Sequence, residues 1–176
     1  PRPDAIGFSD GDLFDLGGVK VEAVHLPGHT RGHSGFRISN EVFFLSDIDL
    51  TGFGPYYGDA WSDLDDFEES LRRVREEEAT WYVTFHHKGV IEGRARFVEL
   101  VDSFRAVIDR RHQAMLNFLA EPRTLGEMVS HRFIYRSHVE LDFVNDVEKR
   151  SAQLHLDRML SRGEASEVEP ERYLRS

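Results

Sequence analysis

Residues 26–34 read LPGHTRGHS, and they follow an alternating, valine-rich run, VKVEAVH, at residues 19–25. The alternation predicts a β-strand, and Pro27 and Gly28 predict that the strand ends in a loop. The two glycines of the loop permit a tight backbone around His29. The sequence therefore places an imidazole directly after a strand.

Two other predicted strands also end in side chains that bind metals. Residues 42–45 (VFFL) are followed by Asp47, and residues 81–85 (WYVTF) are followed by His86 and His87. Neutral imidazole suits zinc or iron, and a carboxylate can bridge two cations. Because each group follows a strand, we expect the three loops to converge on one edge of a sheet. The candidate metal ligands are His29, Asp47, His86 and His87.

Helices are predicted between and after these strands. Apolar residues at helical spacing predict one helix over residues 63–76, with Ser62 as its N-cap, and a long one over residues 95–119. On the second helix, Arg110-Arg111-His112 is assigned to a solvated face. Strands interleaved with helices predict an α/β (α+β) fold for residues 1–120.

A second unit is expected over residues 121–176. Thr124 is expected to cap a short helix, a longer helix covers about residues 144–161, and residues 164–173 alternate weakly, as in a hairpin. Helices followed by a hairpin predict a small, helical, winged-helix-like module.

Composition limits the function classes. The chain has 176 residues, no cysteine and a formal net charge of -10. Thiolate metal sites and disulfides are excluded, and a cytoplasmic location is expected. The acidic balance argues weakly against binding of nucleic acid, and no apolar run is as long as a membrane span.

The stretch at residues 26–34 resembles the PGHTxGH signature of the metallo-β-lactamase superfamily. Residues 43–47 resemble the family's next element, with Ser46 replacing the usual glycine, and residues 85–89 resemble the one after it. The match runs in order and spacing over about residues 8–119. It implies that His29 binds a first metal, that Asp47 bridges two metals, and that His86, or alternatively His87, binds the second.

The same resemblance implies that residues 1–120 are the C-terminal half of an αββα sandwich, and that the tail is the winged-helix-like appendage of some members. The family's HxHxDH motif is not present in the sequence. We therefore expect the remaining ligands to come from a preceding segment of the same gene product or, less favoured, from a second copy of the chain in a homodimer. The chain alone is expected to be inactive.

The function that these residues imply is that of a metal-dependent hydrolase. Two divalent cations, zinc or alternatively iron or manganese, would activate a water against a small thioester- or ester-type substrate. The alternatives are an endoribonuclease of the same superfamily and a non-catalytic binding or scaffold protein with an incomplete site. Separately from the resemblance, His33 is expected to be structural and to bond to the ligand loop.

Overall fold

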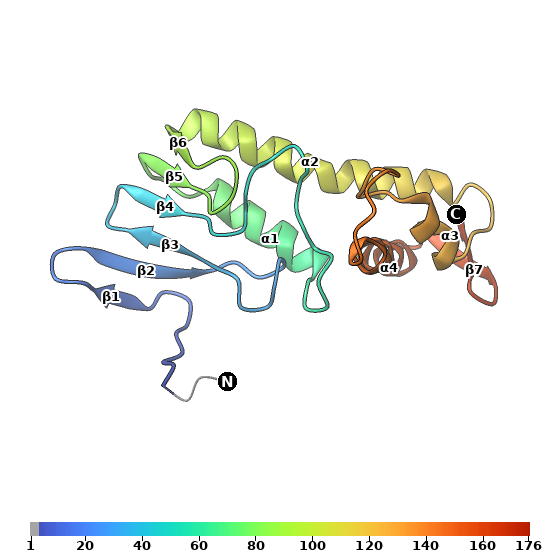
Figure 1. The fold of residues 1–176 in the computed structure, drawn as a ribbon, viewed down its shortest axis with the longest axis horizontal. Coiled ribbons are helices and arrows are strands. Elements are labelled where there is room, and N and C mark those ends of the chain that lie inside the picture. The colour runs from blue at the N-terminus through green and yellow to red at the C-terminus, as the bar shows by residue number, and fades with distance from the viewer. Residues whose placement is uncertain (1–3) are drawn as a thin grey trace.

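A six-stranded mixed sheet forms one end of the protein in the computed structural model, which describes residues 4–176 (Figure 1). The strands lie side by side in chain order: β1 (Leu13–Asp15), β2 (Lys20–His25), β3 (Ser34–Ile38), β4 (Val42–Phe44), β5 (Trp81–Val83) and β6 (Val90–Glu92). Neighbours are antiparallel except β4 and β5, which are parallel. The α/β prediction is confirmed. The short strands β1 and β6 were not expected.

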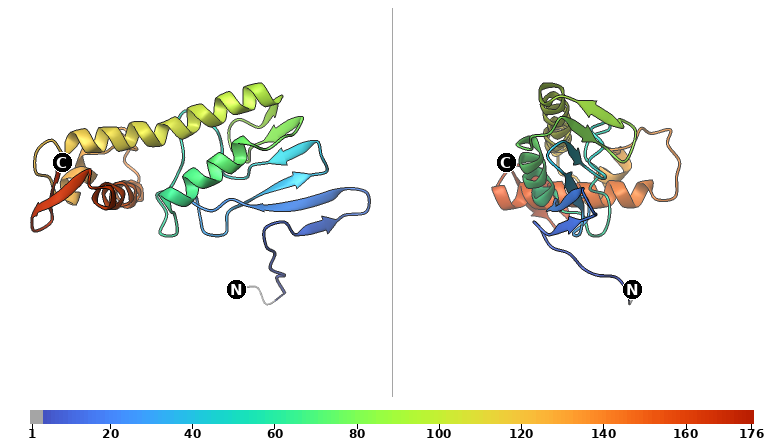
Figure 2. Two further views of the ribbon diagram at one scale, coloured as in Figure 1. Left: turned by 180° about the vertical axis from the view of Figure 1, so that it is seen from behind. Right: turned by 90° about the vertical axis from the view of Figure 1, so that its left-hand side faces the viewer.

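Helix α1 (Leu64–Arg75) connects β4 to β5 and, with α2 (Arg94–Phe118), covers one face of the sheet (Figure 2). Alternate residues of the central strands β4 to β6 enter the core against these helices, among them Phe43, Tyr82 and Ile91. The predicted N-cap of α1 was wrong by one position. Asp63 caps the helix by accepting the N–H groups of residues 65 and 66, while Ser62 bonds to the loop that carries His29.

The opposite face of the sheet is only partly covered among the described residues. Paired strand positions on that face carry Phe36, Phe44, Val83 and Val90, and none of these side chains is fully buried. Phe36 and Phe44 stack with their ring centroids 6.5 Å apart. This leaves an apolar surface opposite the helices.

The 25 residues of α2 span about 37 Å, and the helix continues past the sheet to the tail (Figure 1). The tail holds α3 (Leu125–His131), α4 (Val144–Arg162) and a hairpin of β7 (Ala165–Glu169) and β8 (Arg172–Arg175). Thr124 forms the capping box of α3, and Gly163 ends α4 in the left-handed conformation. The predicted order of helices and hairpin is observed, whereas the winged-helix resemblance stays a prediction.

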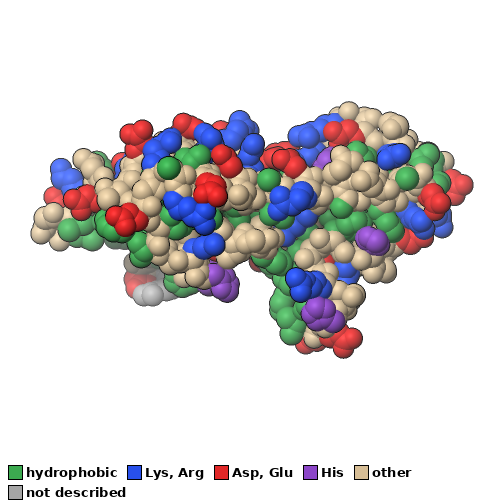
Figure 3. Space-filling model, turned by 90° about the horizontal axis from the view of Figure 1, so that it is seen from above, with side chains coloured by type: hydrophobic (Ala, Val, Ile, Leu, Met, Phe, Trp, Pro, Cys, Tyr) green, Lys and Arg blue, Asp and Glu red, His purple; other side chains and the backbone are tan. Residues whose placement is uncertain are grey.

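A second apolar core holds the tail to the end of α2. Met115 of α2 and Leu119, which caps that helix, pack with Met128 of α3 and with Leu156 and Met159 of α4. Helix α2 therefore contributes to both cores, up to Ile108 in the first and from Met115 onward in the second. Acidic and basic side chains alternate over the face seen from above α2 (Figure 3). No helix in the described part of the chain is long and apolar enough to cross a membrane.

Candidate metal centre

The four predicted ligands line one pocket of about 460 Å³ at the edge of the sheet. Their loops follow β2, β4 and β5, which is the convergence that the sequence predicts. The pocket is lined by His29, Asp47, Asp49, Thr51, Phe53, Gly54, Tyr56, His86, His87 and Phe104. Six of these ten residues, among them Asp47, come from the connection between β4 and α1.

The orientation of the His29 ring is fixed by one hydrogen bond behind it. Its Nδ1 lies 3.0 Å from the backbone oxygen of Tyr56. Because a carbonyl can only accept, Nδ1 carries the proton, and Nε2 of the neutral ring carries the lone pair. This is the arrangement in which a histidine binds a metal through Nε2.

The loop of His29 is seated on the first turns of α1. Gly28 has φ of 121°, and a Cβ there would lie 2.3 Å from the backbone of Phe67. Its carbonyl accepts the N–H of Asp63, and the hydroxyl of Ser62 donates to the carbonyl of His29 at 2.8 Å. Only glycine permits this approach of loop and helix.

His33 connects the loop of His29 to the loop of Asp47. Its Nδ1 donates to the backbone oxygen of Leu26 at 2.7 Å, and its Nε2 accepts the N–H of Asp47 at 3.1 Å. The side chain is 5% exposed, and burial lowers its pKa, so the neutral ring that makes both bonds is favoured. The expectation that His33 is structural is confirmed.

The backbone before Asp47 is left-handed, with φ of 55° at Ser46. This explains why the resembled family places a glycine here, and it shows that serine adopts the same turn. The hydroxyl of Ser46 donates to Oδ2 of Asp47 at 3.1 Å, and its carbonyl accepts the N–H of Phe85. That bond brings the end of β5, and with it His86, to Asp47.

Asp47 and His86 are in contact, with Oδ1 3.2 Å from Nε2. His87 lies beside them, its ring centroid 6.0 Å from that of His86. The contact with Asp47 favours His86 over His87 as the ligand. His86 is about half exposed, so the pocket is open on this side.

These donors are of the types that bind a divalent metal, but they form only part of a ligand set. An imidazole Nε2, a carboxylate and a second imidazole are the ligand types that zinc takes. Among residues 4–176, however, no group of three or more such side chains is close enough to hold a metal ion. The expectation that His29, Asp47 and His86 lie within metal-binding reach is thus met only by the pair of Asp47 and His86.

Comparisons with known proteins agree with this fold. No family model matches the chain. A metallo-β-lactamase family protein of Thermus thermophilus superposes on all of the chain with a TM-score of 0.81 at 24% identity. A β-lactamase domain protein of Burkholderia ambifaria superposes on 99% of the chain with a TM-score of 0.73 at 20% identity. The chain therefore has the fold of metallo-β-lactamase family proteins. It spans 56% of the Thermus thermophilus chain and 53% of the Burkholderia ambifaria chain.

The curated relatives match the chain either at low identity or over a short stretch. An atrochrysone carboxyl ACP thioesterase of Pseudocercospora fijiensis is 26% identical over 131 residues, which cover 72% of this chain and 36% of that protein. An uncharacterised protein of Mycobacterium tuberculosis is 49% identical over 43 residues, which cover 24% of this chain and 19% of that protein. The chain spans well under half of these curated relatives.

Proposed function

We propose that the chain supplies part of the active site of a metal-dependent hydrolase, in which His29, Asp47 and His86 are metal ligands. The observation that carries the proposal is that three strand-end loops bring these residues, with His87, to one pocket. The bond from His29 to Tyr56 and the bonds of His33 orient the first two of them. Side chains held in this way are typical of ligands rather than of solvated loop residues.

The chain's own residues would hold the group as follows. The Nε2 of His29 and a ring nitrogen of His86 would each donate a lone pair, and the Asp47 carboxylate would lie between them. Bound divalent cations, zinc or alternatively iron or manganese, lower the pKa of a bound water so that hydroxide exists near neutral pH. Tyr56 and His33 would keep their hydrogen bonds and act as orienting groups.

A thioester is the substrate class that we propose. The support is the likeness to fungal proteins described as acyl carrier protein thioesterases, at 26% and 27% identity. The further ligands would come from the rest of a longer protein, since the chain spans about half of the solved structures it matches. A second copy of the chain is the alternative source.

One observation also fits a different function. The lack of a three-donor group in the described residues is what a non-catalytic binding protein with an incomplete site would also have. A hydrolase turns over its substrate, whereas a binding protein does not. Nothing in the pocket favours the endoribonuclease alternative, because its lining carries no lysine or arginine.

The test is hydrolysis of a panel of thioesters and esters by the full-length gene product. We expect metal-dependent thioester hydrolysis, lost by at least a hundredfold in His29→Ala. The matched control is His138→Ala, an exposed tail residue, which should keep full activity. Hydrolysis that is absent from the wild type, or unchanged in His29→Ala, would contradict the proposal.

A further inference from the structure

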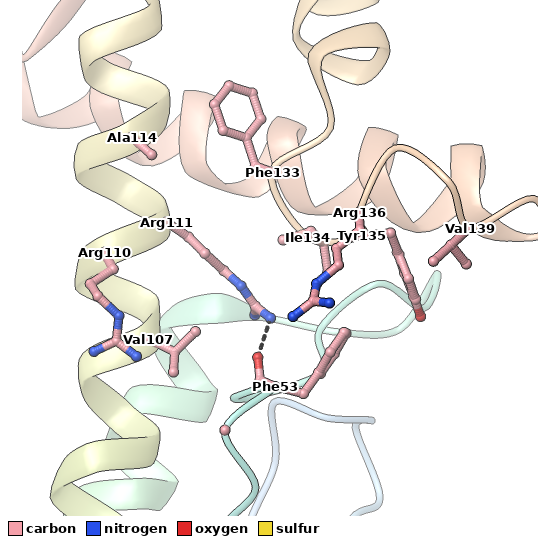
Figure 4. A pocket seen from close by; sticks show the side chains of 11 residues that line it. Phe53, Val107, Arg110, Arg111, Ala114, Phe133, Ile134, Tyr135, Arg136 and Val139 are labelled. Carbon is pink, nitrogen blue, oxygen red and sulfur yellow. Dashed lines mark hydrogen bonds between the residues drawn. The ribbon is translucent and has the colours of Figure 1, made fainter.

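A second pocket, of about 690 Å³, lies beside the candidate metal centre, between α2, residues 52–53 and residues 133–139 (Figure 4). Its lining is rich in arginine and aromatic side chains and, within the described residues, contains no acid: Gly52, Phe53, Val107, Arg110, Arg111, Ala114, Phe133, Ile134, Tyr135, Arg136 and Val139. In a chain of net charge -10, this is a local excess of positive charge.

Arg111 is the buried cation of this pocket, 6% exposed. Its guanidinium donates to the backbone oxygens of Phe53 at 2.7 Å and of Pro55 at 2.6 Å. These oxygens satisfy N–H groups but carry no net charge. The expectation that Arg110-Arg111-His112 lies on a solvated face was wrong for Arg111, because the tail and the loop before α1 enclose that part of the helix.

The other two arginines of the pocket, Arg110 and Arg136, add positive charge to that of Arg111, and no acidic side chain among the described residues of the lining offsets it. In Figure 4 the guanidinium groups of Arg111 and Arg136 point toward one another above Phe53. Among the salt bridges of residues 4–176, none involves Arg110, Arg111 or Arg136. Like charges facing each other repel, and an anion between them removes the repulsion.

The nearest buried acid, Glu148, serves to build the wall of the pocket. Its carboxylate accepts the N–H groups of Phe133, Ile134 and Tyr135 at 2.9, 3.0 and 2.7 Å. One carboxylate held in this way stands against three guanidinium groups. The pocket therefore keeps a positive excess, with its wall fixed before any ligand arrives.

We propose that this pocket binds the phosphate group of a phosphorylated thioester substrate. Guanidinium forks match the oxygens of phosphate, and Phe53, Phe133 and Tyr135 offer apolar and ring surfaces for the group that bears it. Phe53 lines both this pocket and the candidate metal centre, so a ligand anchored here extends past Phe53 toward Asp47 and His86. The thioester half of this inference rests on the proposed function, whereas the phosphate site does not.

The test is calorimetric titration of the full-length protein, in chelator and without turnover. The ligands are coenzyme A, 4′-phosphopantetheine, inorganic phosphate and pantetheine, which lacks the phosphate. We expect coenzyme A or 4′-phosphopantetheine to bind at least tenfold more tightly than pantetheine and inorganic phosphate. If coenzyme A binds more strongly than 4′-phosphopantetheine, the acyl group of the substrate is carried on a nucleotide. If the two bind equally, it is carried on phosphopantetheine alone.

Paired variants separate this site from general charge. Arg110→Gln with Arg136→Gln changes two exposed side chains of the pocket and should weaken binding of the phosphorylated ligand by about tenfold or more. The control, Arg72→Gln with Arg96→Gln, removes the same charge from two exposed sites outside the pocket and should change binding less than twofold. Arg111 is kept because it holds the loop at Phe53.

Three results would overturn the inference: equal affinity for pantetheine and the phosphorylated ligands, equal loss in the control, and tighter binding of a single-stranded RNA 12-mer through the same arginines. The last would assign the pocket to nucleic acid. Because no metal is present, failure of metal binding or hydrolysis overturns only the proposed function. Loss of phosphate binding with intact hydrolysis overturns only this inference.

Discussion

Replacing His33 by alanine should loosen the candidate metal centre and the fold together. The change leaves two backbone groups without partners, the buried carbonyl of Leu26 and the part-buried N–H of Asp47. An unpaired group shielded from water costs about 1–3 kcal/mol, so the free energy of unfolding should fall by about 2–6 kcal/mol. For a typical total of about 5–15 kcal/mol, that is a large fraction.

Urea unfolding in the presence of chelator measures this loss. With a slope of about 2 kcal/mol/M, the midpoint should fall by about 1–3 M. His33→Gln keeps one donor and one acceptor and should recover part of the loss. The control is His25→Ala, an exposed histidine whose Nε2 bonds only to the backbone oxygen of Arg31, with an expected change within about 1 kcal/mol. Equal losses in His33→Ala and His25→Ala would refute the role of His33.

Three further predictions concern other parts of the molecule. Gly28→Ala places a Cβ 2.3 Å from the backbone of Phe67 at a φ of 121°, so the melting temperature of the protein should fall by about 10 °C or more. The control is Gly126→Ala, within α3, where a Cβ has no contact under 3.7 Å; this change should not lower the melting temperature. The pKa of His155 is held well below its ordinary value of 6.5 by burial and, secondarily, by the nearby charges of His112, Arg158 and Arg111. Below about pH 6.5 the unfolded chain therefore binds a proton that the folded chain does not. The free energy of unfolding should then fall by up to about 1.4 kcal/mol for each pH unit. Urea titrations from pH 7.5 to 5 check this, and a slope unchanged in His155→Gln would contradict it. The open sheet face predicts that the isolated 176-residue chain self-associates, with Phe44→Glu shifting it toward monomer in sedimentation equilibrium; a monomeric wild type would count against an apolar surface that needs cover.

The sheet and the helices that cover it followed from local patterns. Alternation at residues 19–25 and apolar spacing along α1 and α2 are strong signals because each side chain faces the core or solvent in turn. β1 and β6 escaped because each has only three residues and few of them are buried. The shift of the N-cap from Ser62 to Asp63 depends on a bond to the distant carbonyl of His29, which no local pattern encodes.

The candidate site also has one part that the sequence predicted and one part that it did not. His29, Asp47, His86 and His87 were found from the sequence because each follows a strand, and strand ends share an edge. The arginine pocket was not found, because it joins residue 53, α2 and residues 133–139, which only tertiary packing brings together. The partners of His112 show the same limit: Nδ1 of His155 lies at 3.1 Å and Oε2 of Glu164 at 2.8 Å, although the sequence placed His112 on a solvated face.

The metal content of the full-length protein tests the central claim most directly. Elemental analysis after equilibration with zinc should find two metals per chain in the wild type and in His138→Ala. His29→Ala, Asp47→Ala and His86→Ala should each lose at least one metal, and His87→Ala should keep both. A wild type without metal, or full metal content in Asp47→Ala and His29→Ala, would contradict the assignment of these residues as ligands.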